Sequence, residues 1–277
     1  MRRRRAVAAA IVAAGVTATA RELGQALAGP DAPRWTRTNH AGNPVSLLEG
    51  PAVAVGTGLG ALAGAPSARH GSAVAIAGLG AGAFGLVDDL TEDPSTRAKG
   101  LRGHLGALAR GELTTGGLKV LGIGATAALA AAVVPRRSVG VGRVLDLAVD
   151  TALVAGAANL VNLLDLRPGR ALKASVVGAV LLAPSSPGST GAVVGAGVAA
   201  APADLAGRDM LGDCGANALG AVLGAELAAT APRPVRCAVL AGIVGLTLAS
   251  ERVSFSAVIA DNPVLHRLDT WGRGGEH

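Results

Sequence analysis

The sequence contains few aromatic and few charged residues. It has two Trp, two Phe and no Tyr among 277 residues, and only 16% of its residues are charged. Soluble domains carry roughly 25% charged residues, so this chain has too little charge to coat a surface in water. The scarcity of Trp and Tyr excludes the aromatic belts that flank many membrane spans. It also removes the base-stacking side chains that single-stranded nucleic acid requires, so we expect no nucleic-acid partner.

Cysteine is equally scarce. Cys214 and Cys237 cannot form a disulfide framework, and Cys237 lies inside an apolar block. The chain has an excess of basic residues and a formal net charge of +6. In an apolar chain, this excess is more simply interpreted as a topology signal and as contact with anionic lipid.

Long apolar blocks are what the sequence does have, since half of its residues are apolar. A helix needs about 20 mostly apolar residues to cross a bilayer. The apolar blocks show no polar stripe, and this absence favours helices that cross the membrane over helices that lie on its surface. The candidate spans cover residues 6–20, 47–66, 71–87, 117–135, 145–164, 171–184, 189–206, 214–231 and 235–250. We therefore predict an all-α fold, a polytopic integral membrane helical bundle of about nine transmembrane helices. Residues 1–277 form a single domain in this prediction.

The carboxylates are concentrated on one side of the predicted membrane. If successive spans alternate in direction, the loops on that side lie at about residues 21–46, 88–119, 165–173, 207–213 and 251–277. In or next to these loops lie 16 of the 19 Asp and Glu residues. Carboxylates contribute little to topology, so this clustering predicts a one-sided active site that faces the cytoplasm. Longer loops on one face are the alternative cause.

The N-terminus conflicts with this assignment of sides. Arg2–Arg5 precede an apolar stretch, as in a signal peptide, and Thr17–Ala20 resembles a small-residue cleavage site. A cytoplasmic N-terminus would place residues 21–46 outside. We keep the alternation and leave open both the side and the retention of this segment.

Two acidic motifs stand at the inner ends of predicted spans. Asp88 and Asp89 are adjacent carboxylates that end one span, a costly arrangement unless they face water, a cation or a metal. Asp213 lies in a glycine turn that leads directly into the span at residues 214–231. Mg²⁺ is held in proteins by one or two carboxylates together with phosphate oxygens. These motifs together predict a site for Mg²⁺ and a phosphorylated ligand.

A third motif adds amides. Asn159, Asn162 and Asp165 follow one another at three-residue intervals, so on a helix they share roughly one face. A basic segment that begins at Lys99 and ends at Lys119 could neutralise phosphate charge on the same side. Each motif is weak by itself, and their convergence at the inner ends of three spans carries the prediction.

At these residues the sequence resembles the polyprenyl-phosphate N-acetylhexosamine-1-phosphate transferases. This family includes phospho-N-acetylmuramoyl-pentapeptide transferase and the undecaprenyl-phosphate GlcNAc-1-phosphate transferases. The resemblance lies in Gly85–Asp89, in Asn159–Asp165 and in Gly212–Gly220, and it extends more weakly to Arg37–Pro44. The order and the sidedness of the motifs agree over about residues 30–225.

The resemblance implies a reaction at the cytoplasmic face of the plasma membrane that depends on Mg²⁺, or on Mn²⁺ in its place. A polyprenyl phosphate would displace UMP from a UDP-linked amino sugar, in cell-envelope glycan synthesis. The implied partners are the polyprenyl phosphate, a nucleotide sugar and the membrane, and a homodimer stays open. By this resemblance Asp213 is the metal ligand. The catalytic candidates are Asp88, Asp89 and Asp165, and the substrate-binding candidates are Asn159, Asn162, Lys119, Arg167 and Asn217.

The sequence departs from the family pattern in the nucleotide-sugar half. The acid at Asp165 is typically followed by Gly in the family, but here by Leu166–Arg170, and a His-rich C-terminal loop is missing. Lys119 stands 30 residues after Asp89, farther than the usual lysine, and nine spans is about one fewer than usual. Arg167 and Arg170 could bind a phosphate donor, or anchor a helix end by the positive-inside rule.

Two other functions stay open. The protein could bind polyprenyl phosphate without catalysis, as a regulator or scaffold of cell-wall assembly. A transporter is less favoured, because transporters place ionisable groups near mid-membrane, often in inverted repeats. Here the acids inside spans, Asp146, Asp150 and Glu226, lie near the outer ends, and we expect Asp146 to pair with Arg143 one turn away.

Overall fold

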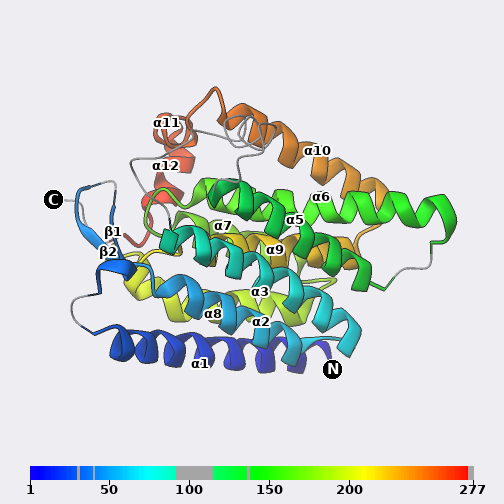
Figure 1. Ribbon diagram of the computed structural model, residues 1–277, viewed down its shortest axis with the longest axis horizontal. Helices are drawn as coiled ribbons and strands as arrows, with labels where there is room; N and C mark the ends of the chain where they lie inside the picture. The colour runs from blue at the N-terminus through cyan, green and yellow to red at the C-terminus, as the bar shows by residue number, and fades with distance from the viewer. Residues whose placement is uncertain (30–31, 40, 92–114, 136–137, 274–277) are drawn as a thin grey trace.

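A computed structural model describes residues 1–29, 32–39, 41–91, 115–135 and 138–273. The described chain is helical apart from one small hairpin and its connecting loops (Figure 1). Its elements are α1 (Arg2–Ala28), η1 (Pro33–Trp35), β1 (Thr36–Thr38), β2 (Pro44–Ser46), α2 (Glu49–Gly64), α3 (Ala68–Thr91), α5 (Thr115–Val133), α6 (Gly140–Leu164), α7 (Arg170–Leu182), α8 (Pro187–Asp204), α9 (Gly212–Thr230), α10 (Arg233–Ser250), α11 (Phe255–Asp261) and α12 (Pro263–Thr270). The prediction of an all-α fold is confirmed. Residues 92–114, which include Lys99, lie outside the described residues.

Each of the nine predicted spans falls on a helix, but not all of these helices could cross a membrane alone. Among the described residues, five helices are long and apolar enough: α1, α3, α5, α6 and α10. The helices α2 and α7 have only 16 and 13 residues. Length and composition therefore support five transmembrane helices rather than nine. Of the remaining four helices, α9 is almost entirely buried by its neighbours, whereas α7 keeps exposed apolar side chains such as Val177 and Leu181.

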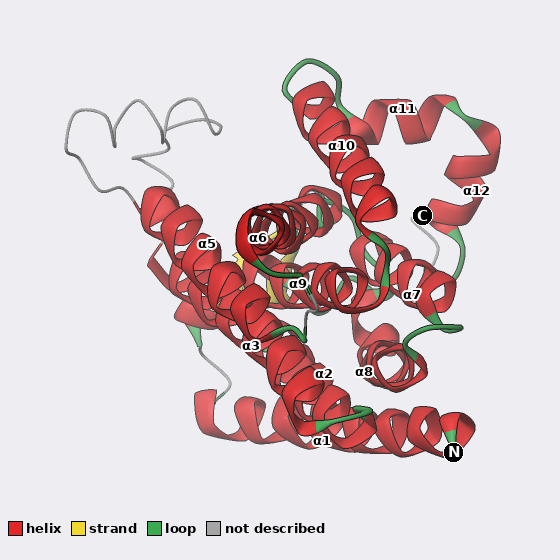
Figure 2. Cartoon of the chain, turned by 90° about the vertical axis from the view of Figure 1, so that its right-hand side faces the viewer, coloured by secondary structure: helices red, strands yellow, loops and turns green. Residues whose placement is uncertain are grey.

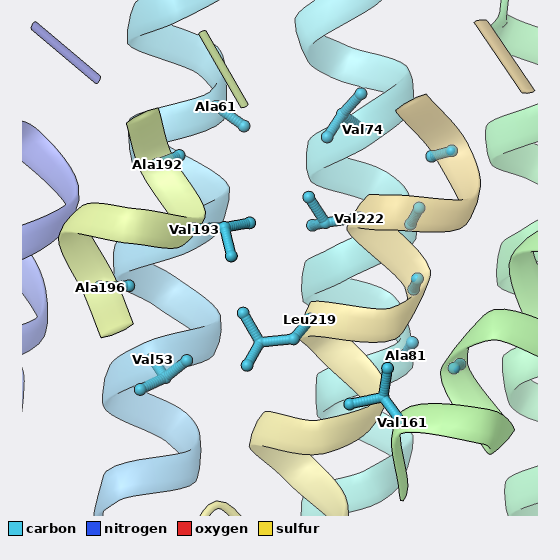
Figure 3. Close-up of a cluster of buried hydrophobic side chains, with 14 of the residues drawn as sticks. Val53, Ala61, Val74, Ala81, Val161, Ala192, Val193, Ala196, Leu219 and Val222 are labelled. Atoms are coloured by element: carbon cyan, nitrogen blue, oxygen red, sulfur yellow. The ribbon is translucent and has the colours of Figure 1, made fainter. Parts of the chain in front are cut away.

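The helix α9 forms the centre of the bundle. Figure 2 shows it surrounded by α3, α6 and α7, and it contacts α2, α3 and α6 extensively. Its side chains Leu219 and Val222 are fully buried and meet Val53 of α2 and Val193 of α8 (Figure 3). The core is apolar and built largely from small residues, which fixes the helix that carries Asp213.

Glycine allows the helix backbones to touch at several crossings. A Cβ atom on Gly191 or Gly195 of α8 would overlap the backbone of α1 at Ala6 or Ala10. A Cβ on Gly85 of α3 would overlap the carbonyl group of Asp213. Small residues at such crossings permit this close approach of the helices.

The inner end of the bundle gathers the segments that were predicted to face the cytoplasm. The strands β1 and β2 pair in antiparallel register, with Arg37 opposite Val45. Ser46 then pairs with the loop before α9, because its N–H donates to the carbonyl of Arg208 and its carbonyl accepts from Met210. The hairpin was not predicted, and it lies at the end of the bundle where α3 and α6 terminate (Figure 1).

At the outer end, the expected pairing of Asp146 with Arg143 is wrong. Asp146 Oδ1 instead accepts hydrogen bonds from Arg233 Nε and Arg236 Nη2, each at 2.8 Å, and Arg236 also pairs with Asp150. Arg143 donates to the carbonyl of Ala132. Asp146 therefore pairs with arginines of a neighbouring helix and not with the arginine of its own helix. The ion pairs that result attach the start of α10 to α6.

Candidate functional site

Three helices bring Asp88, Lys119 and Asp213 together at the inner end of the bundle. Lys119 of α5 donates from Nζ to Asp88 Oδ2 of α3 at 3.2 Å and to Asp213 Oδ2 of α9. All three side chains are at most one quarter exposed. The side chains of Asp88 and Asp213 also lie close enough to affect each other's charge. Two acids therefore share one ammonium group, at a place predicted from separate motifs.

Asp89 has a different role from its neighbour. Its Oδ1 accepts the backbone N–H of Asp213 at 3.0 Å, and its Oδ2 accepts that of Cys214 at 2.9 Å. These are free donors of the first turn of α9, where a carboxylate also complements the helix dipole. Gly212 precedes them with φ of 56°, a conformation that favours glycine. Asp89 thus caps α9 and fixes the backbone of Asp213.

Two predicted amides also contact Asp213. Asn162 lies near the Asp213 carboxylate in the wall of the same cavity, and buried Asn217 donates from Nδ2 to the Asp213 carbonyl at 2.6 Å. Asn159, one turn earlier on α6, lies 3.5 Å from Thr247 Oγ1 of α10. The amides therefore orient Asp213 from α6 and from within α9.

A polar cavity of about 620 Å³ opens beside Asp213. Four further predicted residues line it: Asp89, Asn162, Asp165 and Arg167. Burial raises the pKa of Asp165 well above its ordinary value, and the negative charges of nearby carboxylates raise it further. Asp165 Oδ2 finds no hydrogen-bond partner among the described residues. The cavity thus has an acidic wall, and the unpaired oxygen of Asp165 is buried within that wall.

A second cavity, of about 530 Å³, lies on the other side of the cluster between α5, α6 and α10. Its polar end contains Asp88, Lys119, Asn159 and Asn217. The rest of its wall is mainly apolar and includes Val120, Ile123, Leu240, Ile243, Val244 and Leu248. The nine residues singled out from the sequence are therefore divided between two adjoining cavities, with the Lys119–Asp213 contact at their junction.

Arg170 is not part of either cavity. Its guanidinium makes two hydrogen bonds with Asp269, from Nε at 2.8 Å and from Nη2 at 2.9 Å. The reading of Arg170 as a phosphate ligand is therefore unsupported, because its charge is already paired. Arg167, three residues earlier, lines the polar cavity.

Buried acids beside the polar cavity were missed. Asp204 lines it and accepts the N–H of Gly169 at 2.9 Å, and Asp209 pairs with Arg21. Glu49 is completely buried and finds no partner for either carboxylate oxygen among the described residues. Glu49 and Asp204 lie at the inner ends of predicted spans, as the predicted acids do, and this position in the sequence could have identified them as candidate site residues.

No preformed metal centre is present in the described part of the chain. No three His, Cys, Asp or Glu side chains are grouped there so as to hold a metal ion. Asp88 and Asp213 make a two-carboxylate pair, and the ammonium of Lys119 is bound to both. The assignment of Asp213 as a metal ligand stays a prediction.

Comparison of the sequence with models of known protein families and with curated proteins gives no match. The resemblance to the polyprenyl-phosphate transferases therefore rests on the motifs alone.

Proposed function

We propose that the protein transfers a sugar-1-phosphate from a UDP-linked amino sugar to a polyprenyl phosphate, with Mg²⁺ or Mn²⁺ as cofactor. One observation carries the proposal. The cluster of Asp88, Lys119 and Asp213 lies where a polar cavity and a largely apolar cavity adjoin. An enzyme that joins a water-soluble donor to a lipid acceptor needs this combination.

The polar cavity suits the nucleotide sugar. Its volume of about 620 Å³ is within the usual range for small-ligand sites, roughly 300–1,000 Å³. Arg37 and Arg167 in its wall can each bind phosphate oxygens through two N–H groups. The side chains of Asn162 and Asp165 in the same wall offer polar groups to the hydroxyl and N–H groups of the donor.

The apolar cavity suits the first isoprene units of the lipid. Lys119 and Asn159 at its polar end would hold the phosphate, and the wall formed by α10 would contact the hydrocarbon. In this arrangement the lipid phosphate approaches the donor from the side opposite to the nucleotide. Such positioning is most of what phosphoryl transfer requires from a protein.

The chemistry follows from the charges in the cluster. A lipid-phosphate oxygen forms a bond to the phosphorus next to the sugar, and the bond from that phosphorus to the bridging oxygen breaks. UMP leaves with that oxygen. Lys119 offsets negative charge on the phosphates, and the amides of Asn162 and Asn217 keep Asp213 in place.

The acid pair fits a divalent cation. Asp88 and Asp213 already hold one positive group between them, and Mg²⁺ needs only one or two carboxylates when phosphate oxygens complete its shell. These two residues would hold the ion, which supplies charge neutralisation to the diphosphate when it is bound. Asp89 keeps Asp213 oriented towards it.

We further propose that the nine described helices that coincide with the predicted spans are embedded in the plasma membrane, with the cluster on the cytoplasmic side. The helix α9 carries acids at both ends, yet it is surrounded by other helices rather than by lipid. At its outer end, Glu226 is bound by His70, Ser186 and Ser189. Helices shielded and satisfied in this way need less apolar sequence than those that face lipid.

Release of UMP tests the transfer reaction. Purified protein with undecaprenyl phosphate, Mg²⁺ and a panel of UDP-amino sugars should release UMP. Asp213→Asn should lower the rate by about 100-fold or more, as expected for loss of a charge that stabilises the transition state. Asp261→Asn, which removes an exposed acid from the end of α11, is the matched control and should leave the rate unchanged. Full activity of Asp213→Asn would contradict the mechanism.

A non-catalytic lipid-binding protein is the second candidate. The ammonium of Lys119 fills the space between the two acids, and residues 166–170 depart from the family pattern. Binding of polyprenyl phosphate without product from any nucleotide sugar would favour this candidate. A single confirmed lipid-linked product would reject it.

A further inference from the structure

The helix α12 has an apolar face that no described residue covers. Val264, Leu268 and Trp271 are 68%, 60% and 74% exposed. The exposure of Trp271 stands out because Trp has the largest side chain of the amino acids. Val264 and Leu268 are one turn apart on one side of the helix, and Trp271 is the residue that directly follows its last turn. Leu265, which is 41% exposed, widens this face. We call these four residues the apolar face of α12.

The opposite side of α12 is fixed to the bundle. Buried Asp269 accepts both hydrogen bonds from Arg170 at the start of α7, and Arg273 pairs with Asp269 at 2.8 Å. The ammonium of Lys173 adds hydrogen bonds to the carbonyls of Leu268 and Asp269. The exposure of the apolar face is therefore set by a specific attachment and not by a free end of the chain.

The position of α12 indicates what lies against that face. The helix α10 is one of the five helices that could cross a membrane. Only residues 251–254 separate its inner end from α11, and α12 follows directly. Figure 1 places α11 and α12 towards the end of the bundle that carries β1 and β2, and Figure 2 shows them to one side of the packed helices, beside α7 and α10. The helices α11 and α12 therefore lie at the inner end of the apolar helix α10, to the side of the bundle.

We propose that α12 is an interfacial helix whose apolar face inserts into the headgroup region of the surrounding phospholipid. Amphipathic helices with Trp and Leu on one face bind membranes in this orientation. Exposed Arg267 of α12 and exposed Arg252, which follows the end of α10, can contact lipid phosphates. The proposal rests on the membrane location in the proposed function, but not on the transferase activity.

This attachment links the lipid surface to the polar cavity. Arg273 donates from Nε to the carbonyl of Pro168 at 2.9 Å, and Pro168 lines the cavity together with Arg167. Gly169, the next residue, donates to Asp204 in the same wall. An α12 seated in the membrane therefore holds the loop that presents Arg167.

The two Trp residues make the proposal directly testable. In a Trp35→Phe variant, Trp271 is the single Trp of the chain. The purified variant is placed in nanodiscs of phosphatidylglycerol and phosphatidylethanolamine, with one copy per disc. Matched discs carry bromine at shallow or at deep acyl positions. We expect loss of Trp271 emission in the brominated discs, greater for shallow than for deep bromine. Val264→Asn with Leu268→Asn should reduce that loss and shift the emission to longer wavelength.

A second single-Trp protein separates the two ways of failing. Val239→Trp, in a Trp35→Phe, Trp271→Phe background, places the fluorophore in the middle third of α10, at an exposed position. If this Trp is quenched and Trp271 is not, the membrane location stands and the proposal for α12 is rejected. If neither is quenched, the membrane location itself fails. Trp271 shielding that needs two copies per disc would assign the face to a second copy and also reject the proposal.

Discussion

The carboxylate of Asp89 is bound to the backbone of Asp213, while the carboxylate of its neighbour Asp88 shares Lys119 with the Asp213 side chain. Adjacent acids on one helix therefore act on the same residue in two ways. Asp89 sets where Asp213 lies, and Asp88 sets the charge around it. Removal of one acid should therefore have a different effect from removal of the other.

Asp89→Ala should destabilise the protein more than Asp88→Ala does. Removal of Asp89 leaves two N–H groups of the first turn of α9 without acceptors, and loss of a helix cap costs about 1–2 kcal/mol. Removal of Asp88 leaves Lys119 paired with Asp213. Thermal unfolding in the same detergent measures the difference. Equal melting temperatures for the two variants would contradict the capping role.

Lys119→Met should make the stability of the protein depend on divalent cations. Without the ammonium, Asp88 and Asp213 repel each other, and a bound Mg²⁺ can take over its role. The increase in melting temperature on addition of Mg²⁺ should therefore be larger for Lys119→Met than for the unaltered protein. The double variant with Asp213→Asn is the control, in which this extra increase should disappear.

Gly85→Ala should separate α3 from α9. The new Cβ would overlap the carbonyl of Asp213, and overpacking of this kind costs about 1–3 kcal/mol. Gly124 on α5 has no atom within 4 Å of the corresponding position. Gly124→Ala should therefore be neutral or stabilise the helix by up to about 1 kcal/mol. Unfolding measurements on both variants check the contrast, and a loss of UMP release is expected only for Gly85→Ala.

The attachment of α12 should weaken in acid. Burial raises the pKa of Asp269, but hydrogen bonds and charges from Arg170 and Arg273 outweigh this and hold it below the ordinary value of 3.8. The stabilisation is therefore complete above that value and is lost as the pH falls through the lower pKa of the folded state. Melting temperatures of the unaltered protein and Asp269→Asn should differ by a constant amount from about pH 5 to pH 8. The difference should shrink below about pH 4, and a difference independent of pH would reject the ion pair as its cause.

The helices were predictable because apolar blocks are a strong and local signal. Each predicted span coincides with a helix, although four of them are too short or too polar to count as spans alone. The hairpin of β1 and β2 escaped prediction because its strands have only three residues each. The helix α12 escaped because eight residues show too little of a helical period to be recognised.

The sequence predicted which residues form the candidate site, but not which groups they contact. Spacing placed Asn162 and Asp165 on one face and marked Asp88, Asp89 and Asp213 as a group. The cap made by Asp89 could not be foreseen, since its partners are backbone N–H groups of a helix 124 positions away. The pairing of Asp146 was mispredicted for a related reason. The arginines of α10 are distant in sequence and closer in space than the local candidate.

The crossings at which glycine lets α8 touch α1 have a thermodynamic consequence. Gly and Ala have no side-chain rotamers to lose, so ordering the Gly and Ala residues at these crossings costs backbone entropy and almost no side-chain entropy. Because these residues have no rotatable side chains, no side-chain rotation at the crossings can relieve a clash. A larger residue at Gly191 or Gly195 must therefore push α8 and α1 apart as whole helices. Because the interior is close-packed, the neighbouring helices would have to shift as well.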